Sequence, residues 1–284
     1  CVISASACTM VYVGSDLTSD GSSFLARSED FSNSYNKIAY VNQHGKYKAG
    51  SVYEGCYGFT HTFTHDSYSY TATSDDITSG VCPDCGQTHP LTPMEEVGTH
   101  EQGVSVSAMV TLRANKKVTG IDPMVGGGMC ESDMATILLS EATTAKEGVE
   151  LLLDIYNTVG AEEKSGVLIA DQNEIWYVEN FTGHTYTAIK LSSHMITMNP
   201  NMGAIGLVDL DDTENVIASA NLISVAEQAG TFVGDKNENT IDVFKSYCYY
   251  ASGTPSERLV NGINYFLDGG SETAATLTPE DYTI

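Results

Sequence analysis

The chain has 284 residues, of which 42% are hydrophobic and 9% aromatic, which is the composition of a globular protein and not of a disordered one. Its 37 acidic and 13 basic residues give a net charge of −24, which argues against a nucleic-acid partner or an anionic membrane surface, because both require positive charge. No apolar run approaches the roughly 20 residues that span a bilayer, so we expect no membrane insertion.

The first thirty residues predict a β-hairpin. Residues 9–13 are rich in β-forming side chains, Asp20-Gly21-Ser22 is a turn signal, and residues 24–27 form the second strand. Residues 45–75 are rich in Tyr, Thr and Phe, which favours strands and long loops. Residues 76–100 hold Pro, Gly, Cys and acidic side chains, and we expect them to leave the core as an excursion.

Strands and helices then follow in blocks. Residues 103–112 alternate as a strand does, and a helix capped by Ser132 follows. Thr144 and Glu147 form a capping box that opens a second helix. Further strands are expected at residues 166–170, 175–179 and 186–190, and another helix near residues 218–228. This order predicts an α+β fold in which helices cover layered sheets.

Cys8 stands at the start of the predicted hairpin, where charged side chains of the second strand are expected to lie close to it. The pairing places it opposite roughly Arg27 and Ser28, with Asp30 close by. A nearby Arg lowers the pKa of a thiol, and the thiolate is the nucleophile. A free α-amino group, with a pKa of about 7.7–8.0, could take the thiol proton near neutral pH. A plain buried or disulfide-bonded cysteine is the simpler alternative, and an exposed Arg–Asp pair is often only a surface ion pair.

That amine exists only if the peptide bond before Cys8 is cut. Ala5-Ser6-Ala7 is the A-x-A pattern of a signal-peptidase site, and self-cleavage is the other route. We therefore expect residues 1–7 to be a propeptide or signal-peptide remnant and residues 8–284 to form one domain. The same pattern predicts a secreted or cell-surface protein.

Several short sequence blocks follow one another along the chain in an order that is characteristic of a known family. They lie at residues 8–14, 20–22, 26–30, 70–73, 103–108, 147–152, 176–179, 183–184, 199–201, 205–206 and 208–212. Together they resemble the cysteine dipeptidases of the N-terminal-nucleophile (Ntn) hydrolase superfamily, of the PepD or dipeptidase A type. The resemblance implies a four-layer αββα sandwich, with Cys8 as the nucleophile and Arg27 and Asp30 as active-site residues.

The resemblance also implies an oxyanion donor. In related acylases an Asn just after the central hairpin donates to the oxyanion, and that position falls on Asn201, with Asn199 as the alternative. The family commonly has Asn in an N-E-x-G-V pattern where this chain has His100. His100 is therefore expected either to take over a role at the substrate or to be structural. Many relatives run well past this length, so we expect a truncated or processed C-terminus.

Cys82-Pro-Asp-Cys85, with His89, looks like half of a zinc knuckle. A closed zinc site needs four ligands and the chain has no second CxxC, so a disulfide, a structural metal and free thiols all stay open. The chain has seven cysteines, and an odd count leaves at least one thiol unpaired. The proposed chemistry requires no metal and no cofactor.

The sequence thus predicts cysteine-dependent hydrolysis of dipeptides, with a short peptide as partner and homo-oligomerisation left open. One rival is an Ntn amidohydrolase for acylated amines of the bile-salt or penicillin type, which would need an apolar acyl pocket. Another rival is a non-catalytic secreted binding protein of the same fold.

Overall fold

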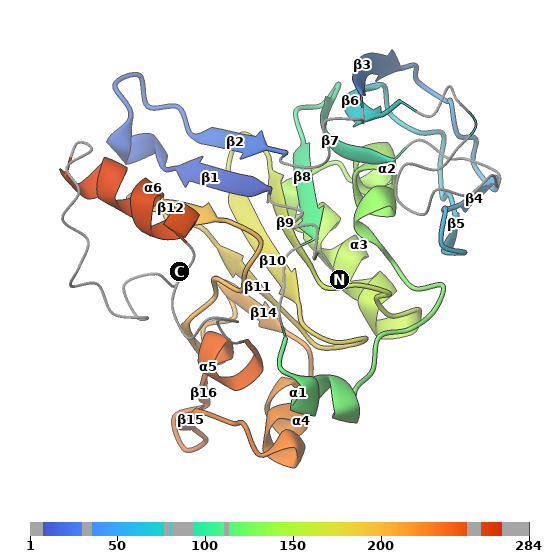
Figure 1. The fold of residues 1–284 in the computed structure, drawn as a ribbon. Coiled ribbons are helices and arrows are strands. Elements are labelled where there is room, and N and C mark those ends of the chain that lie inside the picture. Colours follow the sequence, from blue (N-terminus) through green and yellow to red (C-terminus); the bar gives the residue numbers. More distant parts are fainter. Residues whose placement is uncertain are drawn as a thin grey trace.

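The computed structural model describes residues 8–29, 36–76, 80, 94–110, 114–248, 257–268 and 284. Its centre is an antiparallel eight-stranded sheet in the order β14-β11-β10-β9-β8-β7-β6-β3 (Figure 1). The strands of this main sheet are β3 (Lys37–Asn42), β6 (Tyr70–Asp75), β7 (Glu95–His100), β8 (Ser105–Val110), β9 (Ser165–Ala170), β10 (Ile175–Asn180), β11 (Tyr186–Lys190) and β14 (Val216–Ala218).

A second, three-stranded sheet in the order β12-β1-β2 carries the N-terminal hairpin. Its strands are β1 (Thr9–Val13), β2 (Phe24–Ser28) and β12 (Ile196–Asn199). Two small sheets complete the strands, with β4 (Val52–Glu54) and β5 (Thr60–Thr62) in one and β13 (Leu207–Asp209), β15 (Gly234–Asp235) and β16 (Thr240–Asp242) in the other. The helices are α1 (Lys116–Ile121), α2 (Glu131–Glu141), α3 (Ala145–Thr158), α4 (Leu222–Ala229), α5 (Val243–Tyr247) and α6 (Glu257–Asp268), and a 3-10 turn spans Ser15–Leu17.

Strand β9 shows why the main sheet lies inside the molecule. All six of its residues are buried, because both faces of the sheet are covered. Successive side chains of a strand point to opposite faces. Val167 and Ile169 accordingly join the core under helices α2 and α3, whereas Leu168 and Ala170 join the core that contains Met10 of the second sheet.

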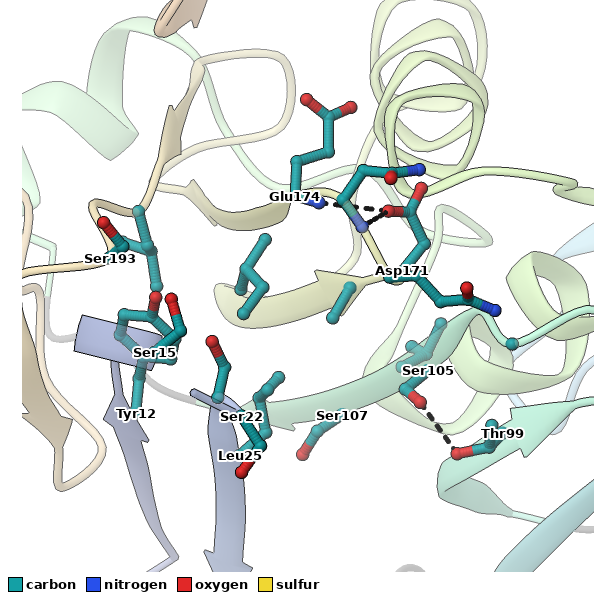
Figure 2. Close-up of a pocket in the computed structure, with 18 of the residues that line it drawn as sticks. Tyr12, Ser15, Ser22, Leu25, Thr99, Ser105, Ser107, Asp171, Glu174 and Ser193 are labelled. Atoms are coloured by element: carbon teal, nitrogen blue, oxygen red, sulfur yellow. Dashed lines mark hydrogen bonds between the residues drawn. The ribbon is translucent and has the colours of Figure 1, made fainter. Parts of the chain in front are cut away.

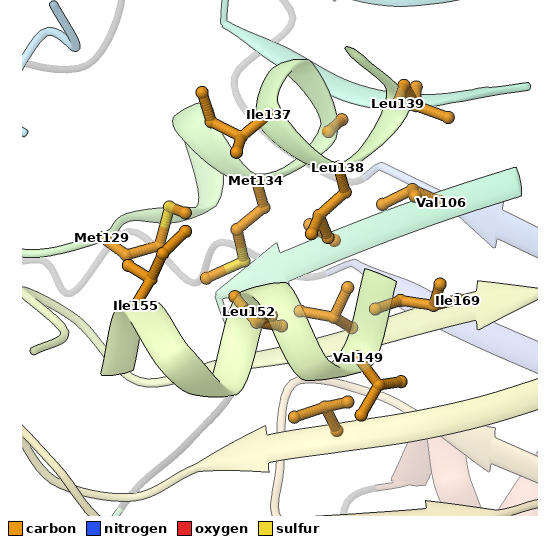
Figure 3. Close-up of a cluster of buried hydrophobic side chains, with 14 of the residues drawn as sticks. Val106, Met129, Met134, Ile137, Leu138, Leu139, Val149, Leu152, Ile155 and Ile169 are labelled. Carbon is orange, nitrogen blue, oxygen red and sulfur yellow. The ribbon is translucent and has the colours of Figure 1, made fainter. Parts of the chain in front are cut away.

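Helices α2 and α3 form the first helical layer. Leu138 of α2 and Leu152 of α3 are fully buried against Val106 and Ile169 of the sheet (Figure 3). Burying one such side chain contributes about 1.5–3 kcal/mol relative to leaving it in water. This cluster fixes the helices on the face of the main sheet that lies away from the hairpin.

The caps of these two helices differ from the prediction. Helix α2 begins one residue before Ser132, its N-cap is Cys130, and the Asp133 carboxylate accepts from the Cys130 N–H at 3.2 Å. Thr144 does cap α3, but the Glu147 carboxylate accepts from the N–H of Thr143 (2.9 Å) instead of closing a full capping box. In both helices a carboxylate of the first turn accepts from a backbone N–H at the helix start that has no partner within the helix, so both arrangements stabilise the helix start.

The outer layer on the other side is α6, which packs on β12. Met198 of β12 points outward, opposite to Asn199, and lies so close to Gly262 of α6 that a Cβ there would sit 1.7 Å from the Met198 sulfur. The order of layers is therefore helices, main sheet, second sheet, helix. The predicted α+β fold with its four αββα layers is confirmed.

Residues 94–100 depart from the expected excursion. The six residues Glu95–His100 form β7, which pairs with β6 and β8 inside the main sheet. Glu95 is buried and Glu96 is mostly so, because distant side chains satisfy them, as when Tyr70 donates to Glu95 at 2.6 Å. Among the residues described, no helix is long and apolar enough to cross a membrane.

Candidate active site

Cys8 immediately precedes β1 and points between the two sheets. It is 8% exposed and lies on the same face of the strand as Met10 and Tyr12, which are also buried. In β2, Arg27 pairs with Met10, so Arg27 lies diagonally across from Cys8 on the same face. The Arg27 guanidinium donates from Nη2 to the Cys8 sulfur at 3.4 Å. The structure thus brings together two of the predicted site residues.

Carboxylates that the sequence did not single out surround Arg27. Its Nη1 contacts Glu96 at 2.8 Å, and its Nη2 contacts Glu131 at 3.1 Å and Glu29 at 3.6 Å. Only 7% of the Arg27 side chain is exposed. The guanidinium is therefore held in place from several sides, and burial does not leave its charge unpaired.

Lys37 anchors the same acidic group from the neighbouring sheet. Its ammonium lies 2.5 Å from Glu29, 2.6 Å from Asp75 and 3.2 Å from Glu96. These three carboxylates are close enough together to hold a cation. Because Lys37 meets all three of them, the protein itself already supplies the positive charge there.

Burial dominates the titration of the Cys8 thiol. Its pKa is raised above the ordinary value by desolvation, and the Arg27 charge and hydrogen bond offset this only in part. The thiol is therefore protonated at neutral pH and needs a base before it can attack. While Ala7 remains attached, the Cys8 nitrogen is an amide, which is not a base.

Asn201 opens into the same cavity as Cys8 and Arg27, which has a volume of about 290 Å³. Its Nδ2 donates to the Val110 carbonyl at 2.6 Å, and its Oδ1 accepts from Arg258 at 3.2 Å. Since an amide nitrogen carries two hydrogens, one N–H of Asn201 is not used by Val110. Arg258 fixes which end of the amide is the donor.

Arg258 of α6 is a site residue that sequence reasoning missed. Its Nη1 donates to the Cys8 carbonyl at 2.5 Å and to the Thr9 hydroxyl at 2.9 Å, and its Nη2 donates to the Pro200 carbonyl at 3.0 Å. One guanidinium thus joins the main chain of the nucleophile to the segment that carries Asn201. The only local signal was the apolar helical spacing of Leu259, Ile263 and Phe266 around it.

Asn199 and His100 lie elsewhere. Asn199 is buried, its side chain donates to Tyr177, and its Oδ1 accepts from the Met202 N–H at 3.0 Å. His100 ends β7, and its Nδ1 accepts from the Gln102 N–H at 2.9 Å while its Nε2 donates to the Ala142 carbonyl at 2.8 Å. Neither residue lines the Cys8 cavity. Their contacts favour structural roles.

Several predicted positions fall outside the described residues: residues 1–7, Asp30, Cys82, Cys85 and His89. Their predicted roles stay predictions. Of the cysteines in the described part of the chain, Cys8, Cys130 and Cys248 are free thiols. Burial raises the thiol pKa of Cys8, Cys130 and Cys248, so Cys8 is distinguished from the other two by its guanidinium neighbour and not by acidity alone.

A larger groove of about 1040 Å³ opens between the hairpin and the main sheet (Figure 2). Tyr12 and Ser15 line one side of it, and Ser105 and Asp171 line the other. The described residues around it include neither Cys nor His. Size alone therefore does not make it the reactive site, although Arg27 borders both cavities.

Buried carboxyl groups give the protein an unusual dependence on pH. Burial raises the pKa of Glu179 to about 7 and also raises the pKa of Glu96 and Glu131. The folded state therefore binds more protons than the unfolded chain between about pH 4.5 and 7. We expect the free energy of unfolding to be highest near the acidic end of that window and to fall as pH rises through it.

Urea unfolding followed by fluorescence of the single Trp176 at about pH 5, 6, 7 and 8 checks this expectation. His100, whose pKa burial lowers, opposes the trend, and His65, whose pKa is raised by its bond to a backbone carbonyl, reinforces it. Carboxyls with lowered pKa, such as Glu141, lose their contribution only at lower pH. A midpoint that rises steadily from about pH 5 to 8 would contradict the expected order.

Comparison with known proteins places the chain in a family. The profile described as "Peptidase family C69" matches residues 7–261. A Streptococcus pyogenes serotype M6 protein named "Probable dipeptidase B" is 37% identical over 242 residues, covering 85% of this chain and 46% of the relative. The "Dipeptidase" of Bifidobacterium longum is 32% identical over 225 residues, covering 72% of this chain and 39% of the relative.

Among solved structures, the penicillin V acylase from Agrobacterium tumefaciens aligns with a TM-score of 0.38 and 16% identity, over 68% of this chain and 49% of that one. At that score the alignment carries no argument about the site. The chain spans about half the length, 46% and 39%, of the curated relatives above. The profile match and the sequence identities show that the chain belongs to peptidase family C69.

Proposed function

We propose that the chain is a cysteine-dependent dipeptidase whose nucleophile is Cys8, freed as a new N-terminus by removal of residues 1–7. The observation that carries this proposal is the placement of the Cys8 sulfur 3.4 Å from Arg27 in a cavity that Asn201 also lines. The names of the relatives support peptide hydrolysis as the reaction. Residues 1–7 would make the uncut chain a zymogen.

The reaction would proceed in two halves. The freed α-amine of Cys8 takes the thiol proton, and the thiolate attacks the peptide carbonyl to form a C–S bond. As the C–N bond breaks, the proton passes to the leaving amine. Water then attacks the thioester, which releases the acyl residue as an acid and restores the thiol. The amine serves as base and acid in turn, as general acid–base catalysis requires.

Two N–H groups would stabilise the oxyanion that forms during the reaction. The N–H of Asn201 that Val110 does not use is a candidate donor to the oxyanion, with a backbone N–H as the second. Arg27 holds the thiol, and Asp30, assigned by the family resemblance, would hold the amine or a substrate terminus. Asp30 follows Glu29 directly, which already borders the cavity.

The lining of the cavity favours peptides over apolar acyl amides. Its described lining includes the carboxylates of Glu29, Asp75, Glu96, Glu131 and Glu163. Such a lining is more polar than an apolar acyl pocket would be, although Met94 and Val110 also contribute to it. It therefore argues against the bile-salt or penicillin type of substrate.

Location outside the cytoplasm is part of the proposal. The Ala5-Ser6-Ala7 sequence directly before Cys8 supports export followed by cleavage at that bond. Self-cleavage would give the same mature N-terminus. We propose a secreted or cell-surface protein.

A hydrolysis assay with paired substrates tests the function. Protein beginning at Cys8 is expected to cleave simple dipeptides, to lose that activity on treatment with iodoacetamide, and to lose it in the variant Cys8→Ala. Cys56→Ala is the matched control, because Cys56 is a cysteine that does not line the cavity. Cleavage of acylated amines but not dipeptides would favour the amidohydrolase, and full activity of Cys8→Ala would exclude the nucleophile.

A further inference from the structure

Glu179, in β10, is a buried carboxylate that the proposed reaction does not use. It is fully buried and makes no ion pair among the described residues. Its Oε1 accepts from the Tyr177 hydroxyl at 2.6 Å, the Ala204 N–H at 2.8 Å and Asn199 Nδ2 at 3.4 Å. Its Oε2 accepts from the Ile205 N–H at 3.3 Å. Neutral donors alone therefore hold this carboxyl group inside the protein.

Three of these four donors belong to one segment, residues 199–205, which runs from the end of β12 towards β13. Asn199 also fixes Met202, because the Asn199 Oδ1 accepts from the Met202 N–H at 3.0 Å. Asn201 lies between the fixed points on either side. The carboxylate thus ties down both flanks of the residue proposed to donate to the oxyanion.

Asn201 needs such a hold. Its φ of 58° is in the left-handed region, which costs most residues with a Cβ about 1–2 kcal/mol and which Asn adopts only as a single residue. A conformation of this kind persists only where the surroundings impose it. No helix or strand includes residues 200–206, so side-chain contacts must impose it.

Glu179 also links the two sheets at the site. It belongs to the main sheet, whereas Asn199 pairs with Met10 in the second sheet, two residues from Cys8. A hydrogen bond from Asn199 to Glu179 therefore crosses from the strand layer that carries the nucleophile to the layer beneath it. A change in the position of Glu179 would therefore change the position of Asn201, although Glu179 does not contact the thiol.

We propose that Glu179 is a positioning residue whose buried carboxylate fixes residues 199–205 and so aims the amide of Asn201 into the Cys8 cavity. The inference rests on the proposed function for the role of Asn201, but the anchoring itself does not. Glu179 touches neither substrate nor thiol and is not a catalytic residue. Replacing it by Gln keeps the size and puts an NH₂ group where an oxygen accepted an N–H.

Hydrogen exchange measures the anchoring without any substrate. In Glu179→Gln the amides of residues 202–206 are expected to exchange at least about tenfold faster than in the unaltered protein, while those of β9 stay unchanged. Glu227→Gln is the matched control, since Glu227 pairs with Lys236 on the exposed surface of α4. Tyr177→Phe, which removes one donor and keeps the carboxylate, replaces the Gln variant if that one fails to fold.

Kinetics then connect the anchoring to the reaction. Glu179→Gln is expected to lower kcat for a dipeptide by about 10–100-fold with KM little changed, because a misaimed donor acts on the transition state. Alkylation of Cys8 by iodoacetamide should keep its rate, since the Arg27 contact is untouched. Glu179→Asp retains the two acceptor oxygens on a shorter side chain. Its kcat should lie between those of the Gln variant and the unaltered protein.

The outcomes separate the two proposals. Unchanged exchange at residues 202–206 would overturn the positioning role, whatever the kinetics show. Faster exchange with an unchanged kcat would also overturn it, because the anchored segment would then not serve the reaction. If the unaltered protein cleaves no dipeptide, the proposed function fails, and exchange alone decides whether Glu179 anchors the segment.

Discussion

Replacing Arg27 by Met is expected to lower the free energy of unfolding by about 3–5 kcal/mol. The substitution removes the cation that lies 2.8 Å from Glu96 and 3.1 Å from Glu131, and it leaves those carboxylates, which are only 12% and 15% exposed, without it. Glu96 keeps Lys37, but Glu131 has no other ion pair among the described residues. Breaking a buried pair from one side costs more than the pair contributes, because the remaining charge stays desolvated.

Urea unfolding of Arg27→Met beside Lys236→Met measures this cost. Lys236 pairs with Glu227 at 2.6 Å, but both side chains are well exposed, so its loss should cost less than about 1 kcal/mol. Equal losses in the two variants would show that the Arg27 cluster is not held as described. Arg27→Lys should recover only part of the stability, since a single ammonium does not reproduce the planar contacts of a guanidinium.

Replacing Asn201 by Ala is expected to lower kcat for a dipeptide by about 10²–10³-fold with little change in KM. The amide N–H would be used when the carbonyl oxygen becomes charged and not when the substrate first binds. Steady-state kinetics on protein beginning at Cys8 provide the measurement.

Backbone strain must be separated from loss of the donor, because Asn201 has a positive φ. Asn201→Gly removes the amide and accepts that φ without cost, so it should lose as much kcat as the Ala variant. Asn237→Ala, in an exposed turn, is the control and should keep full activity. Activity in Asn201→Gly close to that of the unaltered protein would show that the amide is not the oxyanion donor.

The hairpin could be predicted because its signals are local. Alternation along residues 9–13, a Gly turn and a second β-rich run suffice to bring Cys8 and Arg27 to one face. The register differed, since Thr9 pairs with Ser28 and Met10 with Arg27, which puts Cys8 beyond the predicted pairing. The long side chain of Arg27 covers that diagonal, so the contact forms despite the shift.

Strand β7 was not predicted from the sequence, because the hydrogen-bond partners of its acidic side chains lie far away in the chain. Glu95 accepts from Tyr40, Asn42 and Tyr70, and Glu96 from Arg27. Without these partners two adjacent Glu residues indicate a surface loop. Burial of a charge depends on its tertiary neighbours, and a single sequence does not display them.

Arg258 escaped for a related reason. It lies 250 residues from Cys8 in the chain, yet it donates to the Cys8 carbonyl and to Asn201. The amphipathic pattern around it predicts a helix and does not say which strand that helix covers. Only the packing of α6 on β12 brings the guanidinium to the start of β1.

Intact mass and N-terminal sequencing of the purified, active protein test the central claim most directly. We expect the active chain to begin at Cys8, because only then does the buried thiol have an α-amine to accept its proton. An active chain that still begins at Cys1 would contradict the mechanism, since the Cys8 nitrogen would then be an amide.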